Sequence, residues 1–133
     1  MTYEFFIPLR RVPTITGQQR RIGVTKNNKG YVYDPEKIKA VRSLFEAYLA
    51  KHAPKQRIMC GVRLLVKWCF PITGKHFDGE YKLTRPDTDN LQKLLKDSMT
   101  KVGFWKDDAL VCSEIVEKFY AANTGIYIRV DEL

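Results

Sequence analysis

The chain has 133 residues, of which 44% are hydrophobic and 29% are charged, a balance that excludes a disordered chain. With 23 lysines and arginines against 15 acidic residues the net charge is +8, which favours a polyanionic partner, nucleic acid ahead of a membrane surface. No apolar run reaches the roughly 18 residues of a membrane-spanning helix. We therefore expect one domain, residues 1–133, with a core of its own and no membrane partner.

The cysteines and histidines do not suggest a metal or disulfide framework. Cys60, Cys69 and Cys112 are odd in number and widely spaced, and His52 and His76 have no ligand-spaced partners. The N-terminus lacks the basic and apolar segments of a signal peptide. We expect reduced, buried thiols, structural or surface histidines, and a cytoplasmic location.

The first quarter of the chain is basic. The apolar run from Tyr3 to Leu9 predicts a strand, and a turn signal at 27–30 predicts a hairpin with strands over 21–25 and 31–33. Because no acidic residue occurs from Phe5 to Tyr33, we expect this span to lie on DNA phosphates, although an ordinary solvated hairpin would give the same pattern. The candidate DNA-binding residues are Arg10, Arg11, Arg20, Arg21, Lys26 and Lys29.

The rest of the chain alternates helices and strands. Asp34 and Pro35 predict a helix start, and apolar residues at three- and four-residue spacing continue that helix to about His52. Apolar alternation predicts a strand over 62–70, and a second helix begins after Pro86 and ends near Gly103. Two further strands follow at 110–120 and 126–130. This order predicts an α/β fold: a single domain with a mixed β-sheet packed by two main helices.

The start of the second helix carries two carboxylates, Asp87 and Asp89. Taken alone, both have a structural explanation, because a helix N-terminus favours acidic residues as caps and through the helix dipole. Lys93 lies four residues after Asp89, on the same helix face. This spacing predicts either a surface ion pair between the two side chains or a lysine that holds a phosphate. Asp108 lies in the connection to the next strand, where a solvated turn is the alternative.

A basic chain needs a reason to gather acids, because acids repel a phosphate backbone unless a cation lies between them. Three carboxylates that meet in space would form a hard-oxygen site suited to Mg²⁺ or Mn²⁺. Such a metal activates water and stabilises charge on the attacked phosphate. The pattern therefore favours a metal-dependent nuclease.

The motif region resembles a known family. The string Asp87-Thr88-Asp89-Asn90-Leu91-Gln92-Lys93, then Asp97, then Gly103-Phe104-Trp105-Lys106-Asp107-Asp108-Ala109-Leu110-Val111, is similar to the signature of the RusA family of Holliday junction resolvases. These are small, basic, often phage- or prophage-borne endodeoxyribonucleases that act in DNA recombination and repair. The resemblance implies a RusA-like fold and a homodimer. Its paired sites would cut opposed strands of a four-way junction with Mg²⁺, or Mn²⁺ in its place.

The resemblance also assigns roles by position. Asp87, Asp89 and Asp108 would be the catalytic acids that bind the metal, and Lys93 the catalytic lysine near the scissile phosphate. The supporting residues would be Asn90, which orients the site, and Asp107, a weaker candidate beside Asp108.

Two other functions fit the composition. A non-catalytic nucleic-acid-binding protein would use the acids only as helix caps and would bind in a salt-sensitive, metal-independent way. A small interaction protein would instead present its basic surface to an acidic protein partner.

Overall fold

The computed structural model describes residues 1–13, 22–24, 30–32 and 35–133. Its main sheet has four strands in the order β1-β6-β4-β5. β1 pairs antiparallel with β6, β6 pairs antiparallel with β4, and β4 pairs in parallel with β5, so the sheet is mixed, as predicted. The strands are β1 (Thr2–Pro8), β4 (Val62–Pro71), β5 (Val111–Ala121) and β6 (Gly125–Glu132).

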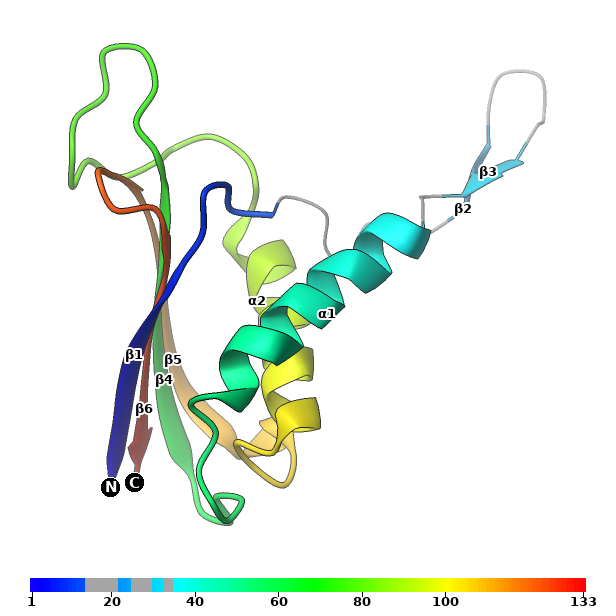
Figure 1. Cartoon of the computed structure of the whole chain (residues 1–133), viewed down its shortest axis with the longest axis vertical. Coiled ribbons are helices and arrows are strands. Elements are labelled where there is room, and N and C mark those ends of the chain that lie inside the picture. The colour runs from blue at the N-terminus through cyan, green and yellow to red at the C-terminus, as the bar shows by residue number, and fades with distance from the viewer. Residues whose placement is uncertain (14–21, 25–29, 33–34) are drawn as a thin grey trace.

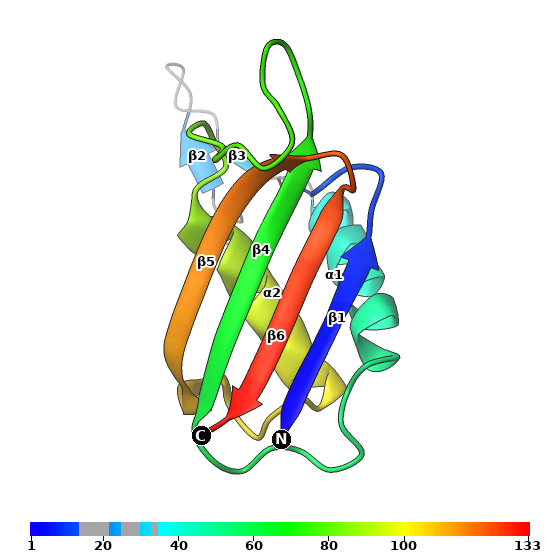
Figure 2. The same ribbon diagram turned by 90° about the vertical axis from the view of Figure 1, so that its left-hand side faces the viewer.

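Two helices, α1 (Pro35–Ala50) and α2 (Thr88–Val102), cover the same face of this sheet (Figures 1 and 2). A short 3₁₀ turn, η2 (Asp108–Leu110), stands between α2 and β5 and was not predicted from the sequence. The predicted α/β fold with a mixed sheet packed by two helices is confirmed. None of the helices in the described part of the chain is long and apolar enough to cross a membrane.

Hydrophobic burial sets the rotation of α2. Leu91, Leu94, Leu95 and Met99 recur at three- and four-residue spacing and are at most 1% exposed, so this stripe packs in the core. The helix ends at Gly103, whose left-handed backbone (φ 97°) lets its N–H reach the carbonyls of the last turn. The opposite stripe of α2 is therefore free to carry polar groups.

The predicted hairpin is present as β2 (Ile22–Val24) paired antiparallel with β3 (Gly30–Val32), separate from the main sheet. The turn residues Asn27 to Lys29 and the predicted helix cap Asp34 lie outside the described residues. In α1 the predicted apolar stripe is largely buried, but Leu44 is 38% exposed and does not belong to the core.

The cysteines are free, as predicted, but the expectation that they are buried was wrong for two of them. Cys60 lies in the loop before β4, and Cys112 lies near the start of β5, which is an edge strand of the main sheet; both are exposed. Cys69 is half-buried on β4, and burial raises the pKa of its thiol above the usual value.

Both histidines have structural contacts, as predicted. The His52 ring stacks on Phe5, with ring centroids 4.3 Å apart. The His76 ring stacks on Tyr120 at 4.1 Å, and its Nδ1 lies 2.5 Å from a carboxylate oxygen of Glu80.

The two ends of the chain meet in the sheet. β1 and β6 pair from Thr2 opposite Asp131 to Pro8 opposite Gly125, and the N-terminal ammonium lies 3.1 Å from the Glu132 carboxylate. Figure 2 shows both termini at the same end of the sheet.

Gly125, where β6 begins, has a φ of +148° and lies against the β1 backbone. A Cβ at this position would lie 2.0 Å from the Ile7 carbonyl oxygen. We expect Gly125→Ala to lower the free energy of unfolding by about 3 kcal/mol or more, because a backbone clash adds to the strained φ. Urea denaturation followed by tryptophan fluorescence measures this change.

Gly79→Ala is the matched control, because Gly79 also has a positive φ (+90°) but nothing lies within 4 Å of its added Cβ. It should cost only about 1–2 kcal/mol. Equal losses in the two variants would contradict the proposed clash.

Candidate active site

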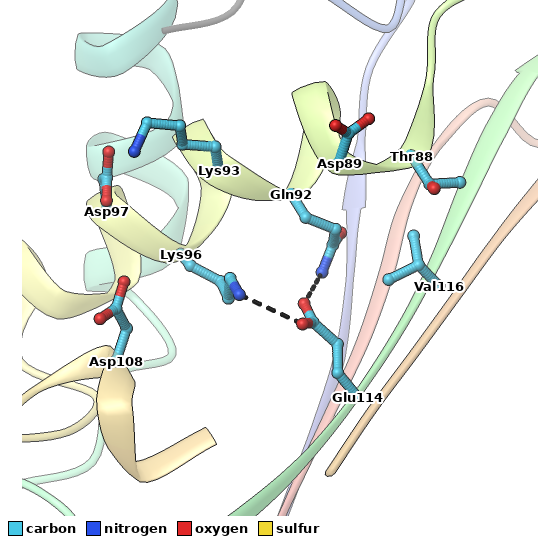
Figure 3. Close-up of a pocket in the computed structure, with 9 residues that line it drawn as sticks. All are labelled: Thr88, Asp89, Gln92, Lys93, Lys96, Asp97, Asp108, Glu114 and Val116. Carbon is cyan, nitrogen blue, oxygen red and sulfur yellow. Dashed lines mark hydrogen bonds and ion pairs between the residues drawn. The ribbon is translucent and has the colours of Figure 1, made fainter. Parts of the chain in front are cut away.

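A cavity of about 450 Å³ opens between α2, η2 and β5 (Figure 3). Four carboxylates and two lysines line it, so its walls carry a surplus of two negative charges in a chain whose net charge is +8. Its lining residues are Thr88, Asp89, Gln92, Lys93, Lys96, Asp97, Asp108, Glu114 and Val116.

The polar stripe of α2 forms one wall. Asp89, Gln92, Lys93, Lys96 and Asp97 follow one another at helical spacing, on the side of α2 away from its leucine stripe. Thus the packing of the core determines which side chains face the cavity.

The segment that leads into α2 is tied to β5. Lys118 donates two hydrogen bonds from its ammonium, to the carbonyl oxygens of Thr84 (2.7 Å) and Pro86 (2.9 Å). The Arg85–Pro86 peptide bond is cis. The sequence leaves the N-cap position open between Asp87 and Thr88; the structure places Asp87 there, but its exposed side chain makes no capping hydrogen bond.

The structure brings three of the predicted site residues to the cavity: Asp89, Lys93 and Asp108. Asp87 and Asn90 are not among the residues that line it. Asp107 has a structural role, because its carboxylate accepts a hydrogen bond from the Ala109 N–H (2.8 Å) and so caps η2.

The carboxylates of Asp89, Asp97 and Asp108 make no hydrogen bond or ion pair with any other described residue. Asp89 in particular does not pair with Lys93, although the two are four residues apart on one helix. Carboxylate oxygens are donors that Mg²⁺ and Mn²⁺ prefer, and these oxygens are not occupied by another described residue. The chemistry of these side chains therefore fits a hard divalent cation.

The acids share the cavity without converging. Within residues 1–13, 22–24, 30–32 and 35–133, no three His, Cys, Asp or Glu side chains are close enough to hold a metal ion together. Asp97 comes eight positions after Asp89 on the helix, a rise of about 12 Å along the axis. Figure 3 shows Asp89 and Asp108 at opposite ends of the cavity, because Asp108 comes only after α2 has ended.

A chain of hydrogen bonds connects the core to the cavity. The buried indole N–H of Trp68 donates to the Gln92 side-chain oxygen (2.8 Å), and the Gln92 amide donates to one oxygen of Glu114 (2.8 Å). The Lys96 ammonium lies 3.1 Å from the other oxygen of Glu114. Gln92 is only 4% exposed, and a buried amide needs hydrogen-bond partners, which Trp68 and Glu114 supply.

Sequence reasoning assigned no role to four charged or amide side chains of the cavity, Gln92, Lys96, Asp97 and Glu114, although Gln92 and Asp97 stand in the quoted motif. The first three could have been found, because their helical spacing places them on the same face as Asp89 and Lys93. Glu114 gave no comparable signal, since it reaches the cavity only through the pairing of β5 in the sheet and the packing of α2.

Two of the predicted DNA-binding residues, Arg10 and Arg11, are exposed just after β1. Arg20, Arg21, Lys26 and Lys29 lie outside the described residues.

Gln92 offers a test of the hydrogen-bond chain. We expect Gln92→Leu to lower the free energy of unfolding by roughly 2 kcal/mol, because it leaves the buried Trp68 N–H without a partner. Urea denaturation followed by circular dichroism measures this loss. Gln56→Leu is the control, since Gln56 is exposed and makes no hydrogen bond with another described residue. A Gln92→Leu protein as stable as this control would contradict the role of the bond.

Comparison with known proteins gave consistent matches. A family model described as Endodeoxyribonuclease RusA matches residues 13–131 of the chain. The chain is 31% identical to the Crossover junction endodeoxyribonuclease rusA of Lactococcus phage r1t, over 135 residues that cover 100% of both proteins. It is 26% identical to the uncharacterized protein YqaN of Bacillus subtilis (strain 168), over 132 residues and 91% of each protein.

A third relative is the Crossover junction endodeoxyribonuclease RusA of Escherichia coli O139:H28 (strain E24377A / ETEC). It is 44% identical over 50 residues, which are 37% of this chain and 42% of that protein. The resemblance inferred from the motif is confirmed by these matches.

Proposed function

This chain belongs to the RusA family of endodeoxyribonucleases, and we propose that it resolves four-way (Holliday) DNA junctions by paired phosphodiester hydrolysis. The strongest support is that Asp89 and Asp108, carried by different elements, line one cavity together with Lys93. The relatives from Lactococcus phage r1t and E. coli are named as crossover junction endodeoxyribonucleases. Recombination and repair of DNA, in phage or prophage genomes among others, are the processes in which such cutting is used.

The proposed cofactor is Mg²⁺, with Mn²⁺ as a substitute, held by Asp87, Asp89 and Asp108. Asp89 and Asp108 have no competing partner among the described residues, and the Asp87 side chain makes no capping hydrogen bond. When bound, a divalent cation would activate the attacking water and balance the charge of the phosphate. Among the described residues no three such side chains are close enough to share one ion in this structure, so Asp87, Asp89 and Asp108 would have to come closer to hold the cation together.

Charge supports a cation in this cavity. A surplus of two negative charges repels a DNA strand, yet the chain around it is strongly basic. The Lys93 ammonium, exposed and unpaired among the described residues, is proposed to hold the scissile phosphate. Asn90 is proposed to orient the site, and Asp107 to hold the backbone before Asp108 by its cap.

The proposed assembly is a homodimer of residues 1–133 that acts in the cytoplasm. A two-fold dimer would present two equivalent cavities to the equivalent strands of a four-way junction. Arg10 and Arg11, with Arg20, Arg21, Lys26 and Lys29, are proposed to bind the junction arms through their phosphates.

Asp89→Asn tests the cutting reaction. We expect wild-type protein to make paired nicks in a synthetic four-way junction with Mg²⁺, and the variant to cut at least about 100-fold more slowly because a metal ligand is lost. Junction binding in EDTA should be equal or tighter, since a charge that repels phosphate is gone. Gel electrophoresis of end-labelled junctions measures both.

Asp78→Asn is the matched control, because Asp78 is not among the cavity residues and accepts a hydrogen bond from the Ala122 N–H, which an asparagine side chain can also accept. Wild-type protein that binds DNA in a salt-sensitive way but never nicks it, with either metal, would favour the non-catalytic binding protein instead.

Asp107 and Asp108 are neighbours with different proposed roles, so they make a second test. Asp107→Asn keeps the cap on η2 through its side-chain oxygen and should cut within about threefold of wild type. Asp108→Asn loses a cavity carboxylate that has no partner among the described residues, and it should cut at least about 100-fold more slowly. The assay is the initial rate of junction nicking at saturating Mg²⁺. The reverse order of activities would refute the assignment of Asp108.

A further inference from the structure

We propose that Glu114 is a positioning residue that keeps the Lys96 ammonium away from the unpartnered carboxylates of the cavity, and so leaves those carboxylates available to a divalent cation. This inference rests on the proposed metal-dependent function. It concerns a pair of residues to which neither the motif nor the resemblance gives a role.

Glu114 is held firmly from the core. One of its oxygens accepts the Gln92 amide at 2.8 Å, and Gln92 is fixed in turn by the Trp68 indole, also at 2.8 Å. Trp68 is fully buried and Gln92 nearly so, which fixes the position of this donor in the cavity wall. The second oxygen of Glu114 therefore has a defined place, and that oxygen receives Lys96.

Lys96 has a choice of acids. Asp89, Asp97, Asp108 and Glu114 all line the cavity, but among the described residues the Lys96 ammonium pairs only with Glu114, at 3.1 Å. Figure 3 shows the Lys96 side chain extending from α2 toward Glu114, with Asp108 on its other side. Neither side chain of the pair is fully exposed (25% and 28%). The fixed carboxylate thus selects one position for a flexible lysine.

Removal of the Glu114 charge should release this lysine into an acidic cavity. A free ammonium on a four-carbon chain would then pair with one of the remaining carboxylates, where it would compete with an incoming cation. The competition requires Lys96 itself, so removing both charges should abolish it. This dependence distinguishes a positioning role from direct binding of metal by Glu114.

The experiment is a calorimetric titration of the metal-free full chain with Mg²⁺, without DNA. We expect Glu114→Gln, which keeps an acceptor for the Gln92 amide, to raise the dissociation constant for Mg²⁺ about fivefold. The double variant Lys96→Met/Glu114→Gln should return to the wild-type value, and Lys96→Met alone should bind Mg²⁺ no more weakly than wild type. The Mg²⁺ concentration at half-maximal nicking should follow the same order.

Each result has a defined meaning. An unchanged dissociation constant in Glu114→Gln overturns the inference, as does a double variant that stays weak, because Glu114 would then be a ligand. If Glu114→Gln does not fold by circular dichroism, Lys96→Met decides alone, and weaker Mg²⁺ binding by that variant overturns the inference. Wild-type protein that neither binds Mg²⁺ nor nicks junctions would instead refute the proposed function.

Discussion

The parallel pairing of β4 with β5 is the constraint on which the candidate site depends. Two parallel neighbours need a connection that returns across the sheet, and α2 makes that return. The buried leucine stripe fixes the rotation of α2 about its own axis, so the polar stripe has to face the edge strand β5. The burial of apolar side chains, which take no part in the chemistry, thereby determines which charged side chains line the cavity.

The site also needs a polar group inside this apolar layer. Trp68 brings an N–H to the core, and a buried donor without a partner is costly. Gln92 satisfies it and carries the interaction outward to Glu114 at the cavity wall. Core packing and site geometry are thus coupled through the Gln92 amide. A substitution in the core at Trp68 would therefore alter the position of the Glu114 carboxylate.

Much of the secondary structure could be predicted, because it follows from the spacing of apolar residues and from turn and cap residues close together in the sequence. The apolar stripe and Gly103 defined α2, and alternation defined β4; the hairpin and the order of elements were also correct. The site was predicted only in part. Asp89, Lys93 and Asp108 stood out as charges near a helix start and a turn, but whether they meet depends on the length of α2 and on its distance from β5. Glu114 and the exposure of Cys60 and Cys112 depend on long-range pairing, which no local spacing reveals.

The meeting of the chain ends has a consequence for how the sheet assembles. Among the described strands β1 has one neighbour, β6, which is the strand farthest from it in the chain. Closing so long a loop costs entropy before any ladder bond is gained, and such non-local pairing slows folding. Until β6 is in place, the apolar residues of β1 have no strand beside them. A chain stopped before Gly125 would lack the strand between β1 and β4, so it would lose the continuity of the whole sheet rather than one edge of it.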